Sequence, residues 1–390
     1  MEKELNFSSI EFDRVDIPVA KEIVKGRQDY IPFSINSNDD FFDTITDAYN
    51  SSTTNSACIE GISDLIFGKG LMSDKYQNFD RLFESEDVKR VVFDIKLYGS
   101  TAIQVYWNDE HTKIIKFYHT PVQNIRAERI GEIPKVQNYY YCTDWSDYRL
   151  VKNKRLIPAF GTSREKMELL YIKSYTPGLY YYSLPDWYSS LQLSFVESEL
   201  NNLHYNNVAN GFFPSAVISL NNGIPEKEKR DQIEYSIGSK FGGSKNSGRF
   251  LLMFNNSKEQ AAEITPINID NLHEKFSYVA DYATDKILVS HRVTSPLLFG
   301  IRTSANGFSS NADELTTAYS IMQTMTINPF QNLIISSLNN VLKIGGYPEA
   351  KLYFEQLTPS VILTNQAEAT DKTLEQVEDD INEANAVEQK

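Results

Sequence analysis

Glycine and hydroxyl residues of the kind that cradle a phosphate occur in the segment GGSKNSGRF, residues 242–250. A P-loop follows a strand, opens a helix and ends in Gly-Lys before Ser or Thr, so that backbone N–H groups surround the phosphates. Here the order is reversed, because a helical pattern precedes the glycines and Gly248 leads through Arg249 into a strand pattern. We therefore interpret the segment as a helix-to-strand connection and expect no nucleotide or other cofactor.

Side chains for nucleophilic or metal-assisted catalysis are present but lack the spacing that such chemistry needs. The sequence contains neither a GxSxG elbow nor an HExxH pair, and its two cysteines, Cys58 and Cys142, do not form a CxxC motif. A lone histidine such as His119 in FYHTP is more often structural than catalytic. The sequence thus predicts no catalytic or metal site, and we expect the protein not to be an enzyme.

The charge balance limits the partners that the chain can bind. It carries 38 Lys and Arg residues against 52 Asp and Glu residues, a formal net charge of −14. A protein that grips nucleic acid by neutralising phosphates needs a basic stripe, so this balance argues against that mode of binding. It does not exclude a surface along which DNA slides without sticking. Because no apolar run approaches a membrane-spanning length and the N-terminus has no apolar signal region, we expect synthesis in a reducing cytoplasm and no membrane partner.

One region departs from this acidic balance. Residues 214–264 contain nearly equal numbers of basic and acidic side chains, which alternate along the sequence. A mixed-charge surface is typical of a protein contact rather than of a nucleic-acid site. The basic candidates on this surface are Lys227, Lys229, Arg230, Lys240, Lys245 and Arg249.

The elements that must position these residues change in type along the chain. Residues 1–40 show no strong period and are expected to form a loosely tied arm. Apolar residues then recur at helical spacing in two pieces after Asp39 and again from Asp87 to Tyr98, where Gly99 follows as a helix stop. The segments TAIQVYW and KIIKFYHT alternate around a turn and predict a hairpin, with further strands in KVQNYYYCTDW and MELLYIKSY. Helices followed by a mainly antiparallel sheet indicate an α+β fold.

A small compact module then interrupts two long helices. The helical patterns cover about 186–210 and 271–290, and the first is rich in asparagine, a poor helix former, so tertiary or subunit contacts must hold it. Between them, SAVISL and RFLLMF read as strands around a helix in IPEKEKRDQIEYSIGSKFG, and AAEITPI is expected to be a further strand. The second long helix is followed by SPLLFGIRTSANGFSSNADEL, residues 295–315, which joins an apolar knot to a polar loop and a helix start.

The helix that starts there is expected to have Asn311 as its N-cap and to bend at Pro329. Beyond it, the last residues, 365–390, are strongly acidic with a thin apolar stripe. They predict a short amphipathic helix with a frayed end.

The order of these parts resembles the portal protein family of tailed bacteriophages, the head-tail connectors of the SPP1 and HK97 type. The resemblance rests on the aromatic helix PDWYSSLQLSFVESELNNLHYNNVANGFFP leading to a strand, on PLLFG with its Ser/Asn-rich loop, and on INPFQNLIISSLNNVL. It covers roughly residues 45–345 and depends on order and spacing rather than on one motif. It implies a structural subunit of a dodecameric ring at one capsid vertex of the virion, assembled in the cytoplasm of a bacterial host.

The resemblance also implies a role for each part of the chain. The expected divisions are an arm (1–40), a wing (41–185, continued by 294–358), two stem helices (186–213 and 265–293), a clip (214–264) and a reduced acidic crown (359–390). The loop 301–310 corresponds to the tunnel loop that touches DNA, through Arg302, Thr303, Ser304, Asn306, Gly307, Phe308, Ser309 and Ser310. The basic clip residues named above would face the packaging motor or adaptor. Candidates for the stem lumen are Lys275, Lys286, His291 and Arg292.

The implied partners are further copies of the chain, double-stranded DNA in the channel, the large terminase subunit that supplies the energy, a head-tail adaptor, and the major capsid or scaffold protein. An acidic channel repels phosphates, so DNA would slide through it with little friction. Two alternatives stay open at this point. One is another ring, minor capsid or adaptor protein of a phage particle, although adaptors are usually shorter. The other is a soluble hydrolase or transferase whose site follows no recognised motif.

Overall fold

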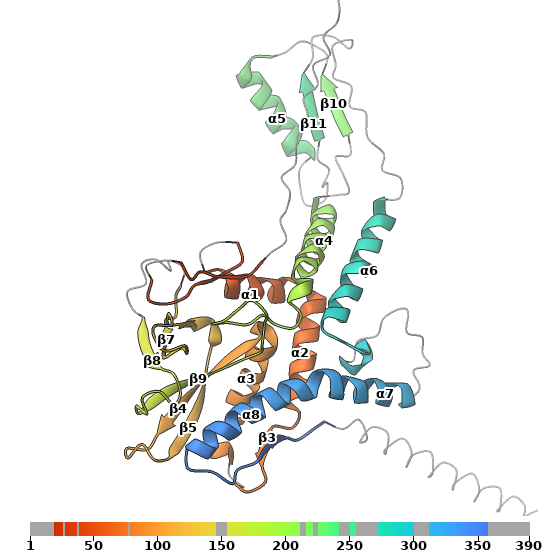
Figure 1. Cartoon of the computed structure of the whole chain (residues 1–390). Coiled ribbons are helices and arrows are strands. Elements are labelled where there is room, and N and C mark those ends of the chain that lie inside the picture. Colours follow the sequence, from red (N-terminus) through yellow and green to blue (C-terminus); the bar gives the residue numbers. More distant parts are fainter. Residues whose placement is uncertain are drawn as a thin grey trace, which may run out of the picture. The chain divides into compact units, whose positions relative to one another are not determined.

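The computed structural model of the chain describes residues 19–25, 28–36, 39–76, 79–145, 154–210, 216–220, 225–241, 250–254, 272–299 and 312–357 (Figure 1). It divides into two compact units. The main unit comprises Met1–Gln192 and Ile287–Lys390, and the inserted unit comprises Leu193–Lys286. The chain therefore leaves the main unit once and returns to it.

Three helices open the main unit where the sequence predicts them: α1 (Phe41–Ser51), α2 (Thr53–Phe67) and α3 (Ser85–Tyr98). Ser52 separates the first two, and its hydroxyl accepts a hydrogen bond from the backbone N–H of Asn55, which caps α2. Gly99 ends α3 in the left-handed region with φ of 79°, a conformation that glycine adopts without a steric penalty.

Antiparallel strands follow these helices, as the alternating sequence predicts. One sheet has the order β5-β4-β9, with β4 (Ser100–Trp107) between β5 (Ile114–Thr120) and β9 (Met167–Lys173). A second sheet has the order β6-β7-β8, formed by β6 (Ile125–Ala127), β7 (Asn138–Tyr141) and β8 (Arg155–Pro158). A bridge between Ala159 and Leu169 joins the two sheets. The smaller pairs are β1 (Lys21–Glu22) with β2 (Phe33–Ser34) and β3 (Leu71–Ser73) with β12 (Leu352–Phe354).

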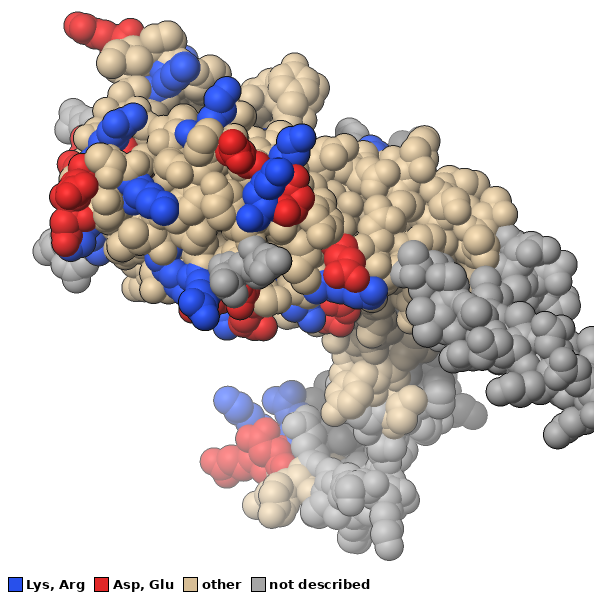
Figure 2. Space-filling view, turned by 90° about the horizontal axis from the view of Figure 1, so that it is seen from below, with Lys and Arg blue, Asp and Glu red and all other residues tan. Residues whose placement is uncertain are grey.

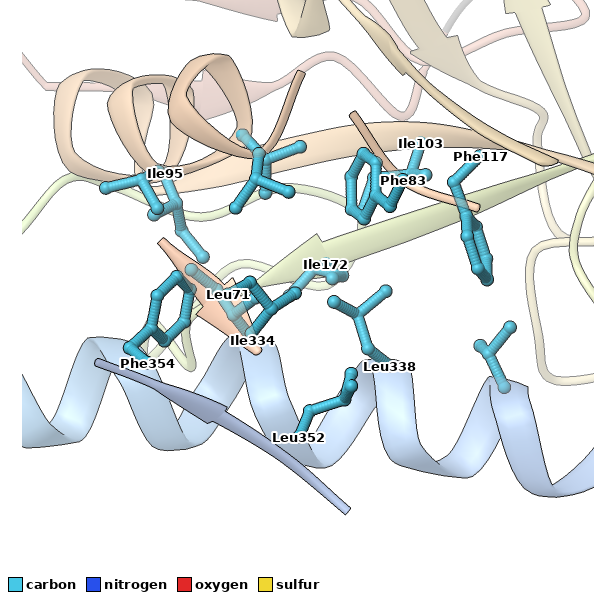
Figure 3. Packing of buried hydrophobic residues seen from close by; sticks show 14 of the residues in the cluster. Leu71, Phe83, Ile95, Ile103, Phe117, Ile172, Ile334, Leu338, Leu352 and Phe354 are labelled. Atoms are coloured by element: carbon cyan, nitrogen blue, oxygen red, sulfur yellow. The ribbon is translucent and has the colours of Figure 1, made fainter. Parts of the chain in front are cut away.

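The main core lies between the β5-β4-β9 sheet, α2, α3 and the helix that ends at Ile344. Figure 3 shows Ile95 of α3, Ile103 and Phe117 of the β4–β5 hairpin and Ile334 and Leu338 near the C-terminal end of the chain pointing toward one another. All five side chains are fully buried. Burying an aliphatic or aromatic side chain of this size stabilises the fold by about 1.5–3 kcal/mol. The core thus joins helices and strands that are more than 200 positions apart along the chain (Figure 1).

The N-terminal segment is held more firmly than its sequence predicts. Tyr30, Ile31 and Phe33 are buried, and the ring of Phe33 stacks on that of Tyr182 with centroids 4.8 Å apart. The carboxylate of Glu22 accepts hydrogen bonds from three successive backbone N–H groups, beginning at Tyr180. The expectation of a loose arm is therefore wrong for residues 28–36, because aromatic side chains that show no period in sequence find partners about 150 positions away.

The inserted unit contains β10 (Ala216–Leu220), α5 (Lys227–Phe241) and β11 (Phe250–Phe254). The two strands pair in parallel, as a strand-helix-strand crossover allows. The strand expected at residues 261–267 lies outside the described residues. Two long helices cross the boundary between the units, α4 (Leu191–Asn210) and α6 (Leu272–Ser290).

A nearly continuous helical segment completes the main unit. It consists of α7 (Ala312–Met322), a π-helical turn (Gln323–Ile327) and α8 (Asn328–Ile344), which follow one another in almost one line in Figure 1. In place of the bend expected at Pro329, the structure has this wide turn directly before the proline. A proline in a helix cannot donate to the carbonyl four positions earlier and its ring crowds that carbonyl, and widening the preceding turn relieves the crowding. The predicted N-cap Asn311 and the acidic segment 359–390 lie outside the described residues.

Candidate functional site

A cluster of buried polar side chains lies in the main unit, where α4 begins and α6 ends. We call it the helix base and define it by Asn55, Lys96, Asp186, Trp187 and His291. Asn55, Lys96, Trp187 and His291 have 0% of their surface exposed, and the side chain of Asp186 is exposed by 15%. Buried polar groups are costly unless they are hydrogen-bonded, so their partners decide what this cluster does.

Lys96 and Asp186 form an ion pair at the centre of the helix base. The ammonium Nζ donates to both carboxylate oxygens of Asp186, at 2.8 and 3.0 Å. It also lies 5.5 Å from the centroid of the Phe330 ring of α8. Lys96 comes from the last turn of α3 and Asp186 from the segment leading into α4, so the pair fixes the start of α4 to the core of the main unit.

His291 lies next to this pair at the end of α6. Its Nε2–H donates to the side-chain oxygen of Asn55 at 2.8 Å, and its ring stacks on Trp187 with centroids 5.8 Å apart. The indole N–H of Trp187 in turn donates to the backbone carbonyl of Lys96 at 3.2 Å. Burial, and then the neighbouring charge of Lys96, hold the pKa of His291 well below its usual value, so the imidazole is neutral at neutral pH.

Two further contacts hold the same junction together. The hydroxyls of Ser190 and Ser290 lie 2.6 Å apart, which joins the chain just before it enters α4 to the chain at the end of α6. A Cβ atom on Gly99 would stand 2.7 Å from the nitrogen of Pro185 and closer still to the carbonyl of Leu184. Only glycine therefore permits the segment that leads into α4 to lie against the end of α3.

The side chains of the helix base hold the start of α4 and the end of α6 against α2 and α3. The helix base contains one neutral histidine, one ion pair and no nucleophile directed at a cavity. Among the described residues no group of three or more His, Cys, Asp or Glu side chains is arranged to hold a metal ion. In the same part of the chain, no helix combines the length and the apolar character required to span a bilayer.

The structure places the sequence-predicted residues in different surroundings. The tunnel-loop candidates from Arg302 to Ser310, and the clip candidates Lys245 and Arg249, lie outside the described residues. The side chains of Lys227, Lys229 and Arg230 are exposed on the first turn of α5, and Lys240 lies near its end.

The four lumen candidates separate into two groups. Lys275, Lys286 and Arg292 are exposed, and Lys286 lies 5.6 Å from the ring centroid of Tyr282, one turn earlier on α6. Tyr282 stacks on Tyr278, which gives α6 a line of exposed aromatic and basic side chains. His291 has 0% exposure, so its imidazole cannot line a channel, and that prediction is wrong. The sequence placed it at a helix end but did not reveal Asn55 and Trp187 as its partners.

Lys96 was not among the site residues predicted from the sequence, although a signal was present. Lys96 stands four positions after Val92, which puts it on the same face of the helix as the apolar residues. A lysine on an apolar face indicates either a stem that reaches the surface or a buried ion pair. The structure shows the second.

Comparisons with known proteins reveal similarity in structure only. No protein-family model and no curated protein matches the chain. A protein in the neck of the native gene transfer agent (GTA) particle, computed with C12 symmetry, aligns at 15% identity over 85% of this chain and 88% of its own, with a TM-score of 0.56. The same neck in the empty particle, computed with C6 symmetry, gives 15% identity, the same coverage and a TM-score of 0.54.

A crystal structure of an HK97 family phage portal protein from Corynebacterium diphtheriae aligns at 12% identity over 81% of this chain and 96% of its own, with a TM-score of 0.49. The alignments with the GTA neck extend over both units, since they cover 85% of the chain. The phage portal protein fold predicted from the sequence is confirmed, and the chain shares this fold with a protein of the gene transfer agent neck.

Proposed function

We propose that this chain is the subunit of a portal ring, a closed homo-oligomer at one vertex of a phage-like capsid. Double-stranded DNA would pass through the ring during packaging and ejection. A large terminase subunit and later a head-tail adaptor would dock on it, and the major capsid or scaffold protein would surround it. The observation that carries the proposal is the fold shared over 85% of the chain with a neck protein computed with C12 symmetry.

The surface chemistry of the described residues agrees with a conduit rather than a tight DNA-binding protein. The chain carries a net charge of −14, and a channel that repels phosphates lets a duplex move. The exposed cations on α6, Lys275 and Lys286, alternate with Glu274, Asp281 and Asp285, so they offer weak phosphate contacts without a basic stripe. We assign them to the stem and the loop 301–310 to the tunnel.

The inserted unit suits a docking role. Its helix α5 begins with Lys227, Lys229 and Arg230 between Glu226, Glu228 and Asp231, all exposed where the structure describes them. Opposite charges in close alternation give specificity toward a protein surface with a matching pattern. We therefore propose that residues 214–264 form the clip that meets the terminase or the adaptor.

The proposal is tested on the purified chain and in a packaging assay. Native mass spectrometry and negative-stain microscopy are expected to show closed rings of about a dozen subunits, because a head-to-tail contact repeated by a constant rotation closes into a ring and the neck that shares this fold was computed with C12 symmetry. A stable monomer or dimer at high concentration would overturn the portal assignment.

A loop variant then separates the ring from its channel. Deleting Thr303–Ser310 is expected to leave ring assembly intact and to impair DNA packaging or retention, and replacing these residues by a Gly-Ser sequence of equal length controls for the connection. Loss of folding in the deletion but not in the replacement would show that the segment is a structural connection rather than a tunnel loop.

A further inference from the structure

The longest stretch of this sequence without a charged residue runs from Leu315 to Leu342. It contains no Asp, Glu, Lys or Arg, in a chain of which 23% of the residues are charged. Asp313 and Glu314 precede it and Lys343 ends it. A buried strand or a membrane helix lacks charged residues because it is removed from water. This stretch is neither, because it forms most of α7, the π-helical turn and α8 on the outside of the main unit.

One side of this helical segment is buried and the other is exposed. Met322, Ile327, Ile334 and Leu338 have 0% exposed surface and face the core. The opposite side, which we call the uncharged face, consists of Ile321, Thr324, Met325, Asn332, Ser336 and Asn340, all exposed or nearly so. Ile321 is exposed by 49% and Met325 by 62%. Figure 2 shows charged side chains spread over the left-hand part of the main unit, whereas the right-hand part, where Figure 1 places α7, has almost none.

This composition is unusual for a helix face in water. A solvated face normally carries Lys, Glu, Arg or Gln, which are good helix formers and keep a protein soluble, whereas Thr, Ser and Asn are poor helix formers. Depletion of charge together with exposed methionine and isoleucine is the composition of the centre of a protein interface. Short side chains also allow another backbone to come close.

We propose that the uncharged face is a contact between adjacent copies of this chain in the ring, an inference that rests on the proposed function. Each copy carries a net charge of −14, so two copies repel each other wherever their acidic surfaces meet. A contact between them must therefore use surface without carboxylates. The uncharged face is the longest such surface that the sequence offers. DNA is the weaker candidate, because this face has no cation to meet a phosphate.

The uncharged face is large enough to form part of such a contact. From Ile321 to Asn340 it is about 30 Å long at about 1.5 Å per residue, and a strip about 10 Å wide along it offers roughly 300 Å². A stable interface uses about 800 Å² from each partner, so this strip can supply more than a third of it.

Charge-insertion variants test the proposal. Ile321→Glu, Thr324→Glu and Met325→Glu each place a carboxylate at an exposed position of the uncharged face, outside the buried core. Ile115→Glu is the matched control, since Ile115 on the β4–β5 hairpin is exposed by 51%, against 49% for Ile321. Met325→Leu keeps the apolar surface. Circular dichroism confirms that each variant is folded, and native mass spectrometry over a range of concentrations measures assembly.

We expect the three glutamate variants to require at least tenfold more protein for half-assembly than the unmodified chain, and Ile115→Glu and Met325→Leu to assemble like it. If the unmodified chain forms rings and the glutamate variants form them equally well, the inference is wrong while the portal assignment stands. If Ile115→Glu weakens assembly as much as the others, added charge acts without regard to position and the inference is also wrong. If the unmodified chain stays monomeric, both the proposed function and this inference are wrong.

Discussion

Replacing Lys96 by methionine is expected to destabilise the main unit strongly. The Lys96 side chain has 0% exposed surface and that of Asp186 has 15%, and their charged atoms lie 2.8 Å apart. Methionine fills nearly the same volume but leaves the carboxylate without its cation in a mostly dry site. Breaking a buried pair on one side costs about 3–5 kcal/mol. Because Asp186 keeps a little contact with water, we expect a loss near the lower end, about 3 kcal/mol.

The control is an ion pair of the same type on the surface. Lys166 and Asp109 lie 3.2 Å apart with side chains that are 70% and 93% exposed. Exposed pairs contribute about 0–1 kcal/mol, so Lys166→Met is expected to change the free energy of unfolding by no more than that. The double variant Lys96→Met with Asp186→Asn removes both charges and is expected to recover part of the loss.

Urea unfolding followed by circular dichroism, at one fixed protein concentration, measures these differences. A second measurement follows the histidine resonances by NMR. The charge of Lys96 helps to lower the pKa of His291, so Lys96→Met is expected to raise that pKa. If Lys96→Met costs less than about 1 kcal/mol more than Lys166→Met, the pair does not anchor α4 as argued.

Two further predictions concern the same junction. Gly99→Ala is expected to lower the free energy of unfolding by about 3 kcal/mol, because the new Cβ meets both a left-handed φ and the carbonyl of Leu184. Gly178→Ala has a φ of 83° but no atom within 4 Å of the added Cβ, so it is expected to cost about 1 kcal/mol. Equal losses in urea unfolding would refute the close approach of Leu184 to Gly99. The depressed pKa of His291 means that, below its ordinary value of 6.5, the unfolded chain binds a proton that the folded chain does not, so stability is lost as the pH falls. Relative to His291→Gln, the unmodified protein is expected to lose about 1.4 kcal/mol per pH unit in that window. Parallel pH profiles for the two proteins would contradict this.

The order of helices and strands in the main unit was predictable because it depends on local spacing. Apolar residues from Val88 to Ile95 recur three and four positions apart, and the expected helix over 87–98 is observed as Ser85–Tyr98. The hairpin was predicted for the same reason, since alternation and the turn NDEHT lie within one short window. The glycine-rich segment at 242–250 was interpreted as a helix-to-strand connection, and α5 and β11 do flank it.

Contacts between distant positions were not predictable from local spacing. Lys96 meets Asp186 across 90 positions and His291 meets Asn55 across 236. Nothing in the composition near either residue identifies its partner, since a lysine and a histidine at helix ends have ordinary surface explanations. The tight fit of residues 28–36 was missed in the same way, because aromatic residues without a period find partners only in the folded chain.

The helix base also explains how a compact main unit tolerates the insertion of Leu193–Lys286. A domain accepts an insertion at low cost when the two chain ends at the insertion point already lie together, since the main unit then folds around a closed junction whatever is inserted. Here the ends are joined by the hydroxyls of Ser190 and Ser290 at 2.6 Å and by the stack of Trp187 on His291. These contacts are made entirely by residues of the main unit, so the junction does not depend on the sequence of the inserted unit. Substitutions within residues 214–264, the proposed clip, can therefore change that unit without disturbing the fold that carries it.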